Sequence, residues 1–412
     1  MVGEWNKATI GDFLDFKNGL NKGKEFFGHG TPIINYTDVY NHRGLVKSDV
    51  KGTVELQTDE ISRYEVRRGD VFFTRTSETP EEVGLTAVLL EDIQDCVFSG
   101  FVLRGRPKND LFLPEYCKYC FSSAEIRNRI VSSCTYTTRA LTNGTQLSKI
   151  KIQVPPKSEQ KEIADALSDM DELILNLKKL IVKEEGVKKA SLDQLFPKSN
   201  GATPKLRVGG HNKPWKSYSL EEVISEMYNG QTPSRFHDDF WNGNINWLTS
   251  GELNRGHVKK TKEKITERGK ESSNLRIIPK GTFVIAITGL EAKGTRGNCA
   301  IVDVETTLNQ SCMALIPDKK KLDTEFLYQW YMRVGDEYGV KYTQGTKQQS
   351  YNYDILKKLI ISMPELDEQK AIAEYFRDLD MSIKTHKQDL NKYLLIRQGM
   401  MEELLTGKVR LV

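Results

Sequence analysis

Two short stretches combine the residue types that phosphodiester chemistry uses. "EQKEIA" (159–164) and "EQKAIA" (368–373) each place a glutamate two residues before a lysine. Many nucleases have this spacing, because the carboxylate binds Mg²⁺ while the lysine stabilises developing negative charge. A nuclease site also needs a strand and a converging Asp, whereas both stretches here follow prolines and begin helical patterns. We therefore interpret the glutamates as groups near helix N-termini, where the helix dipole favours negative charge.

Other catalytic patterns are missing from the sequence. "GLNKGKE" (19–25) resembles a phosphate-binding loop but is one residue short, and it lacks the Ser or Thr after Lys24 that would hold magnesium. "VPPK" (154–157) lacks both flanks of the Asn/Asp-Pro-Pro-aromatic tetrapeptide of amino-methylating enzymes. Neither GxSxG, nor HExxH, nor a Gly-rich dinucleotide turn occurs. We therefore expect that this chain alone is not an enzyme.

Composition indicates a globular protein of more than one domain. A chain of 412 residues is too long for one compact core. It shows neither an apolar run long enough to span a membrane nor a signal peptide, so we expect a cytoplasmic protein. The cysteine pair Cys117 and Cys120 has no second pair to complete a zinc site, so we expect buried thiols and no metal.

Positive charge is concentrated in one segment. The net charge is only +4, but residues 251–300 contain eleven Lys or Arg against five Asp or Glu. Such a concentration is expected where a protein neutralises phosphates. A solvated basic face is an equally good explanation of this feature alone.

The chain is an internal repeat with a period of about 210 residues. Trp5 and Trp215 open similar stretches, and Gly69 in "VRRGDVFFTRT" matches Gly281 in "IIPKGTFVIAIT". The period is far too long for a solenoid and indicates a duplicated pair of domains. In each copy, short β-rich runs with one helical stretch (around 113–131 and 323–334) precede a long helical pattern, which predicts an α+β fold.

The helical patterns after Pro155 and Pro364 repeat apolar residues at alternating spacings of four and three. This heptad seam predicts two long helices that form a coiled coil within the chain, with Ser158 and Asp367 as N-caps. Residues 163–195 would make a rod of about 50 Å. We expect His386, at the position of Leu177, to lie near the rod surface without a role; a role in fixing the register is the alternative. The predicted seam comprises Ile163, Leu167, Met170, Ile174, Leu177 and Ile181, then Ile372, Phe376, Leu379, Ile383, His386, Leu390, Tyr393, Met400 and Leu404.

This organisation resembles the specificity subunit of Type I restriction-modification systems over nearly the whole chain. The resemblance rests on the duplicated unit, on "GQTPSR" (230–235), and on a "P...EQ..IA" pattern that leads into a long helix in both copies. "TGLEAKGTRGN" (288–298) and "TQGTKQQS" (343–350) are also similar to the family.

The resemblance implies two tandem globular target recognition domains joined by two long conserved helices in an antiparallel coiled coil, with an internal pseudo-two-fold repeat. Each domain would read one half of a bipartite, asymmetric DNA site, and antiparallel helices would place the half-sites about 34 to 36 Å apart. The implied boundaries are 1–153 for target recognition domain 1, 154–196 for the central helix, 197–214 for a linker, 215–363 for target recognition domain 2 and 364–412 for the C-terminal helix.

The resemblance also implies partners and cofactors. Two methyltransferase subunits would use S-adenosylmethionine to methylate adenine, and two restriction subunits with motor and nuclease activity would use ATP and Mg²⁺. This chain itself would carry no cofactor, and no membrane is involved.

DNA contacts are transferred by motif. Arg reads guanine and Gln reads adenine by paired hydrogen bonds, while Lys and Thr more often hold phosphate. The first domain has "GLNKGK" where the second has "GQTPSR", so its positions come from matching stretches. The expected DNA-binding residues are Lys22, Lys24, Arg75, Thr76, Thr138 and Arg139 in the first domain, and Thr232, Ser234, Arg235, Lys293, Arg296, Thr346, Lys347, Gln348 and Gln349 in the second.

Two other function classes fit part of the sequence. One is the specificity part of a combined single-chain restriction-modification enzyme of Type IIB or IIG kind. The missing catalytic motifs and the length of 412 residues argue against it. The other is a coiled-coil interaction protein with incidental basic loops, against which the twice-repeated loops argue.

Overall fold

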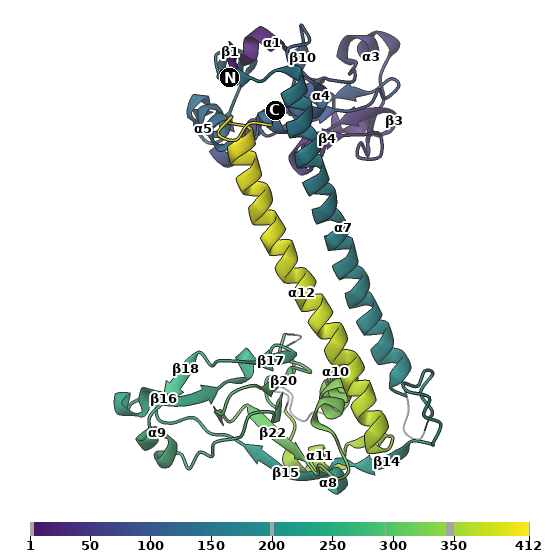
Figure 1. Cartoon of the computed structure of the whole chain (residues 1–412), viewed down its shortest axis with the longest axis vertical. Helices are drawn as coiled ribbons and strands as arrows, with labels where there is room; N and C mark the ends of the chain where they lie inside the picture. Colours follow the sequence, from purple (N-terminus) through teal and green to yellow (C-terminus); the bar gives the residue numbers. More distant parts are fainter. Residues whose placement is uncertain (1–3, 198–201, 293, 343–349, 412) are drawn as a thin grey trace. The chain divides into compact units, whose positions relative to one another are not determined.

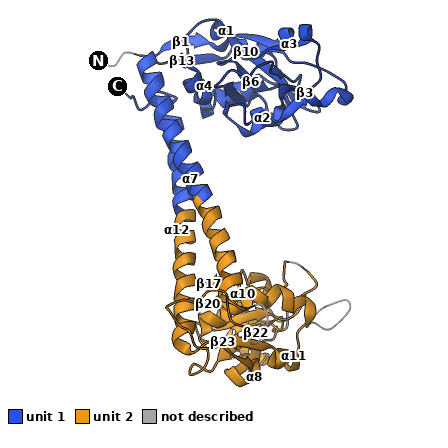
Figure 2. Cartoon of the chain, turned by 90° about the vertical axis from the view of Figure 1, so that its right-hand side faces the viewer, with its two compact units in different colours: residues 1–179, 388–412 blue, residues 180–387 orange. Residues whose placement is uncertain are grey.

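The computed structural model describes residues 4–197, 202–292, 294–342 and 350–411. The chain divides into two compact units (Figure 2). Unit 1 comprises residues 1–179 and 388–412, and unit 2 comprises residues 180–387. Each unit therefore contains one globular domain and a part of each long helix, α7 (Lys157–Leu195) and α12 (Leu366–Leu404).

The same five-stranded sheet occurs in both units. Its first four strands are mutually antiparallel, and its last strand is parallel to the fourth. The identical order confirms the duplication that the sequence predicted. The strands are, in order, β2 (Leu14–Asn18), β10 (Val102–Pro107), β6 (Val71–Thr74), β8 (Thr86–Leu89) and β4 (Gly44–Leu45) in unit 1, and β15 (Ile224–Asn229), β22 (Cys312–Pro317), β19 (Phe283–Ala286), β20 (Cys299–Val302) and β17 (Gly256–Val258) in unit 2.

Smaller sheets are duplicated as well. In each copy a two-stranded sheet pairs the first strand of the domain with the strand before the long helix. Each copy also has a three-stranded sheet, whose longest strand is β3 or β16. Unit 1 has a further sheet of β7 (Thr76–Ser77), β12 (Ala140–Leu141) and β11 (Thr135–Tyr136). The duplicated sheets are β1 (Asn6–Thr9) with β13 (Lys151–Val154), β14 (Lys216–Ser219) with β23 (Ile360–Met363), β5 (Gly52–Val54) with β3 (Phe27–Ile34) and β9 (Val97–Phe98), and β18 (Glu263–Ile265) with β16 (Trp241–Leu248) and β21 (Thr307–Leu308).

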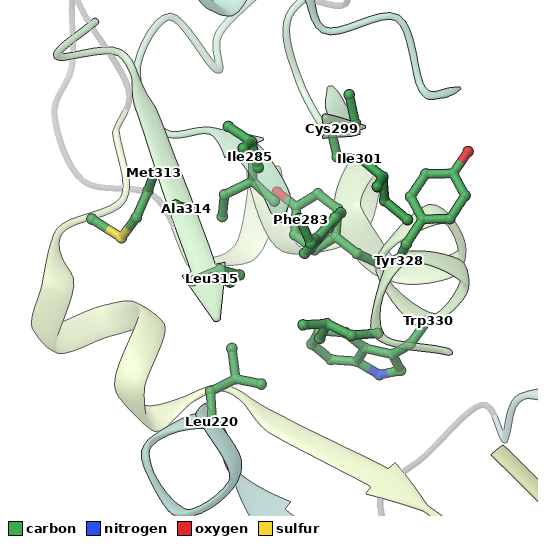
Figure 3. Packing of buried hydrophobic residues seen from close by; sticks show 14 of the residues in the cluster. Leu220, Phe283, Ile285, Cys299, Ile301, Met313, Ala314, Leu315, Tyr328 and Trp330 are labelled. Carbon is green, nitrogen blue, oxygen red and sulfur yellow. The ribbon is translucent and has the colours of Figure 1, made fainter. Parts of the chain in front are cut away.

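Helices cover these sheets. In unit 2, α10 (Thr324–Lys341) packs on the central strands, and Phe283 and Tyr328 meet edge to face in the core (Figure 3). Asp323 caps α10, because its carboxylate accepts a hydrogen bond from the Phe326 amide at 3.0 Å. The remaining helices are α1 (Ile10–Phe13), α2 (Tyr36–Asn41), α3 (Thr58–Tyr64), α4 (Pro114–Cys120), α5 (Ala124–Ser133), α6 (Gly144–Ser148), α8 (Leu220–Val223), α9 (Glu267–Ser272) and α11 (Tyr353–Lys358), with short 3-10 turns η1 (Lys24–Phe26), η2 (Pro80–Glu82), η3 (Asp238–Phe240) and η4 (Ser250–Glu252).

The two long helices are drawn in Figure 1, and several residues of the predicted seam are buried, among them Ile174, Ile181 and Ile383. In unit 2, Lys188 pairs with Asp380 and Ser191 with Tyr375, so rising numbers on α7 meet falling numbers on α12. The helices are therefore antiparallel. Apolar seam residues at both ends are buried in the domain cores: Ile163 and Leu167 with Leu404 in unit 1, and Leu192 and Leu195 with Ile372 and Phe376 in unit 2.

The polar seam residue has a partner on the facing helix. His386 Nδ1 lies 2.9 Å from a carboxylate oxygen of Glu184, whose other oxygen accepts a hydrogen bond from Ser382 at 2.8 Å. Both His386 and Glu184 are partly buried. The expectation that His386 lies near the rod surface without a role is therefore not favoured. The contact favours the alternative, in which this residue fixes the helix register.

The repeated Glu-Gln pair anchors each long helix to its domain. In unit 1, Gln160 accepts a hydrogen bond from the Leu113 amide at 2.9 Å and donates to the carbonyls of Leu111 and Pro155 at 3.0 and 2.9 Å. In unit 2, Gln369 makes the same three bonds with Asp323, Lys321 and Pro364, each at 2.9 Å. Each glutamine thus satisfies three backbone groups where the helix, the preceding strand and a loop meet.

The glutamates of the pair are buried and ion-paired. Glu159 binds Arg410 through two hydrogen bonds of 2.6 Å and accepts another from the Trp5 indole at 2.9 Å. Glu368 pairs in the same way with Arg207. Burial raises the pKa of the Glu159 carboxyl, but the hydrogen bonds from Arg410 and Trp5 outweigh burial, so this pKa lies below its usual value. The glutamates are therefore structural anchors.

The predicted N-caps are wrong. The helices begin at Lys157 and Leu366, so Ser158 and Asp367 lie inside the first turn. The first helical carbonyls are those of Pro156 and Glu365, which accept hydrogen bonds from the Gln160 and Gln369 amides at 2.9 and 3.1 Å. The buried glutamine requires this earlier start, because its side chain must reach back to the carbonyl of the preceding proline.

Candidate nucleic-acid interface

Four loop segments meet at one place in unit 1. The Leu20 amide donates to the Phe98 carbonyl at 2.9 Å, and the Gly100 amide donates to the Leu20 carbonyl at 2.7 Å. The Arg75 amide donates to the Phe101 carbonyl at 3.2 Å. The Arg75 carbonyl accepts a hydrogen bond from the Thr142 amide at 3.0 Å. We call segments 19–21, 75–76, 99–101 and 140–142 the junction of unit 1. It brings together residues that are more than a hundred positions apart.

Unit 2 has a junction that repeats three of these four hydrogen bonds. The Gln231 amide donates to the Leu308 carbonyl at 3.0 Å, the Ile287 amide to the Ser311 carbonyl at 2.9 Å, and the Tyr351 amide to the Ile287 carbonyl at 2.9 Å. Its segments are 230–232, 287–288, 309–311 and 350–351. The two junctions thus share three backbone hydrogen bonds, while their side chains differ.

A glycine permits the close approach of segments in each junction. A Cβ atom at Gly19 would lie 2.1 Å from the Ser99 carbonyl oxygen, and one at Gly230 would lie 1.9 Å from the Leu308 carbonyl oxygen. No side chain fits at these distances, because the obstacle is backbone. Glycine is therefore required at positions 19 and 230, directly after β2 and β15.

The structure brings together four of the six residues predicted in unit 1. Arg75 and Thr76 lie in the junction, and Thr138 and Arg139 lie at the turn between β11 and β12, in the same small sheet. Thr138 and Arg139 are exposed. This turn and the junction therefore contain two cations and two hydroxyl groups from segments about sixty residues apart; Arg139 is exposed, whereas Arg75 is partly buried and its Nε is enclosed.

The two predicted lysines of unit 1 differ in their surroundings. Lys22 forms an ion pair with Glu60 at 2.8 Å and lies over the Phe26 ring, so its charge is partly neutralised within the protein. Lys24 begins η1 and is exposed. Lys24 is thus the better placed of the two to contact a phosphate.

In unit 2, Thr232 lies in the junction, while two predicted arginines hold loops. Thr232 donates a hydrogen bond to the Gln310 side chain. The Arg296 guanidinium donates to the carbonyls of Leu290 and Glu291 at 2.8 and 3.1 Å, which closes its own loop. The Arg235 guanidinium binds both carboxylate oxygens of Glu263, and this hydrogen bonding raises its pKa above the usual value. The predicted residues Lys293, Thr346, Lys347, Gln348 and Gln349 lie outside the described residues, and Ser234 is exposed beside Arg235.

The sequence reasoning missed two junction residues. Phe101 is 66% exposed in unit 1, and Gln310 carries the side-chain contact to Thr232 in unit 2. Both precede a central strand, β10 or β22, and belong to no recognised motif. Aligning the two copies and asking which exposed positions differ between them would have found them, since Gly100 and Phe101 stand where the second copy has Gln310 and Ser311.

Within the described ranges, no three His, Cys, Asp or Glu side chains lie close enough to hold a metal ion. No described helix combines the length and apolar character that a membrane crossing requires. Cys117 and Cys120 are buried, and burial raises the pKa of the Cys120 thiol.

Comparisons with known proteins agree with this architecture. The family model described as the Type I restriction modification DNA specificity domain matches residues 3–185 and 212–393. A putative type I restriction enzyme MjaX specificity subunit of Methanocaldococcus jannaschii is 23% identical, over 99% of this chain and 94% of its own length. The EcoKI specificity subunit of Escherichia coli is 32% identical, over 36% of this chain and 32% of its own length.

Solved structures share the fold. The HsdS subunit of Thermoanaerobacter tengcongensis matches with a TM-score of 0.55 and 16% identity, over 98% of this chain and 97% of that chain. The S subunit of a Type I restriction-modification system from M. genitalium matches with a TM-score of 0.54 and 16% identity, over 97% and 96%. These likenesses, together with the two matched domains, confirm the predicted fold class.

Proposed function

Because this chain belongs to the Type I restriction modification DNA specificity family, we propose that its two junctions read the two halves of a bipartite, asymmetric DNA sequence. As a specificity subunit, the protein has a DNA-recognition role. The finer assignment rests on one observation: three backbone hydrogen bonds of the junction recur in the second copy, with different side chains around them.

The side chains of the two junctions differ in the chemistry that they offer to DNA. Unit 1 presents Arg75 with the nearby Arg139, and an arginine can bind guanine through two hydrogen bonds. Unit 2 presents Gln310 beside Thr232, and a glutamine can bind adenine in the same manner. Different half-sites for the two units are the direct consequence.

We further propose that the long helices hold the partner subunits of a Type I complex. Two methyltransferase subunits would supply S-adenosylmethionine, and restriction subunits would supply the ATP- and Mg²⁺-dependent steps. This chain would contribute recognition and no catalysis. The cytoplasm, where the DNA is, would be its compartment.

An adenine-methylation map of the host genome, with and without the gene, tests the proposal. We expect the loss of one motif made of two short fixed blocks around unspecified bases. Loss of no motif, in a host with an active partner methyltransferase, would overturn the recognition role.

Substitutions in one junction test independent reading. Gln310→Ala and replacement of the loop 343–350 should change the block read by unit 2 and leave the other block intact. Arg139→Ala is the matched variant for unit 1 and should affect only the other block. A change in both blocks after a single substitution would contradict the assignment of one half-site to each junction.

A further inference from the structure

An aromatic side chain stands fully in solvent beside the junction of unit 2. Phe236 is 98% exposed, whereas most aromatic residues of this unit are partly or fully buried. An exposed phenyl ring gains nothing from the protein and forgoes the stabilisation that burial gives. An exposed aromatic residue on a well-held loop therefore indicates a ligand with which the ring makes contact.

The loop that carries Phe236 is held firmly by its neighbours. The Trp247 indole donates to the Gln231 carbonyl at 3.0 Å, and the Trp241 indole donates to the Ser234 carbonyl at 3.1 Å. Both rings belong to β16. The loop between Gly230 and η3 is thus attached to β16 at two points before the turn at Arg235 and Phe236.

Arg235 completes the attachment. Its guanidinium lies over the Trp241 ring, 3.6 Å from the centroid, and binds both carboxylate oxygens of Glu263 on β18. A guanidinium held in this way offers little of its donor fork to a base. The geometry therefore makes Arg235 a positioning residue, which differs from the base-reading role expected from the motif.

Unit 1 has exposed rings elsewhere, Phe101 and Tyr136, but its segment that corresponds to the Phe236 loop contains no aromatic residue. Between the junction glycine and the following 3-10 turn, unit 1 has four residues (20–23) and unit 2 has seven (231–237). Phe236 lies in the longer segment. Whatever Phe236 does is therefore specific to the half-site of unit 2.

The surrounding charge indicates the kind of ligand. Glu263, which binds Arg235 next to Phe236, is flanked on its strand by Lys262 and Lys264, and both lysines are exposed. Asp238 and Asp239 follow Phe236 in the chain, and Asp239 forms an ion pair with Arg268. An exposed aromatic ring on a loop held against a strand with two exposed lysines suits DNA, which combines flat rings with phosphates.

We propose that Phe236 inserts at a base step in the half-site read by unit 2 and partly unstacks it, with Arg235 and Glu263 holding the loop in place. This inference rests on the proposed function. Apolar wedges of this kind kink DNA, and pyrimidine–purine steps unstack most readily. The half-site of unit 2 then contains or adjoins such a step.

The test uses the full chain with its partner methyltransferase and a duplex that carries the mapped target. 2-Aminopurine, which fluoresces more strongly when unstacked, replaces one adenine at a time in the unit 2 half. We expect wild-type protein to raise the fluorescence at one step. Phe236→Ala should abolish this rise and weaken binding about tenfold to a hundredfold, as loss of an aromatic–base contact does.

Three further variants separate stacking from folding. Phe236→Trp should keep the fluorescence rise, because it keeps a flat ring. Glu263→Gln should reduce the rise by loosening Arg235, without a change in the partner association measured by gel filtration. Ile277→Ala removes another exposed apolar side chain of unit 2 and should change nothing.

The outcomes are distinguishable. If wild-type complex shows no preference for any duplex, the proposed function fails. If it binds its target and Phe236→Ala matches it in affinity and fluorescence, the wedge is refuted. If Phe236→Ala keeps DNA affinity but no longer associates with the methyltransferase, the ring is a protein contact and the wedge is also refuted.

Discussion

Replacing Gln369 by alanine should destabilise unit 2 more than any change on the exposed face of the same helix. The side chain is 1% exposed and makes three hydrogen bonds of 2.9 Å to backbone groups of Asp323, Lys321 and Pro364. Each such bond contributes about 1 to 1.5 kcal/mol. Three of them give about 3 to 5 kcal/mol, because alanine leaves one amide and two carbonyls unsatisfied.

Hydrogen exchange measured by mass spectrometry on the full chain is the appropriate assay, since it locates the loss of stability. We expect protection to fall at the start of α10 and of α12. Lys370→Ala is the control, because this neighbouring residue is exposed. Gln160→Ala should produce an equal loss in unit 1, because it removes the equivalent three bonds.

A second variant, Gln369→Glu, tests whether the two hydrogen bonds that the Gln369 amide donates are the stabilising ones. It keeps the acceptor for the Asp323 amide but places carboxylate oxygens against two carbonyls. At neutral pH this variant should be less stable than Gln369→Ala. Acidification should restore part of its stability, because the protonated carboxyl regains one donor and burial raises the pKa of such a group. A loss for Gln369→Ala below about 1 kcal/mol, or equal to that of Lys370→Ala, would refute the reasoning.

Three other predictions concern stability. In the folded protein the pKa of Glu159 lies below its usual value of 4.5. The ionised carboxylate therefore stabilises the fold above about pH 4.5, and this stabilisation is lost as the pH falls through the pKa of the folded state. The stability of Glu159→Gln should accordingly depend less on pH in this acidic range when acid unfolding is measured. Trp5→Phe removes a hydrogen bond to Glu159, whereas the Trp215 indole has no partner among the described residues. In urea unfolding, Trp5→Phe should therefore lower the free energy of unfolding by about 1.5 to 3 kcal/mol more than Trp215→Phe does. Gly230→Ala should cost about 2 kcal/mol or more and weaken recognition of one half-site, while Gly251→Ala, with its nearest atom at 4.0 Å, should be nearly silent in both measurements.

Much of the fold follows from the sequence, because the repeat can be read directly from it. Matching stretches such as those at Trp5 and Trp215 predicted two copies of one domain, and both five-stranded sheets have the same order. The heptad seam predicted α7 and α12, because burial along a helix is periodic. Their starts were placed wrongly, since the local signal of a capping residue competes with a side-chain contact that only the folded chain contains.

The candidate site was predicted in part. Arg75, Thr76, Thr138, Arg139 and Thr232 were expected from motifs, and the structure places them at or beside the junctions. Phe101 and Gln310 were missed because they belong to no motif, and they reach the site only through pairing of distant strands. The five residues expected at Lys293 and in 346–349 lie outside the described residues and remain predictions.

The sequence by itself determined that the chain is a duplicated α+β protein with two long amphipathic helices, because repetition and periodicity are properties of residue order. Tertiary structure decided what individual side chains do. Glu159 and Gln160 resemble part of a nuclease motif in the sequence, yet they anchor a helix because Arg410 and the Leu111 loop fold against them. Arg235 is expected from its motif to contact DNA, and the structure adds that Glu263 and Trp241 hold its guanidinium. A side chain's role depends on the partners that folding brings within reach, and no spacing along the chain contains that information.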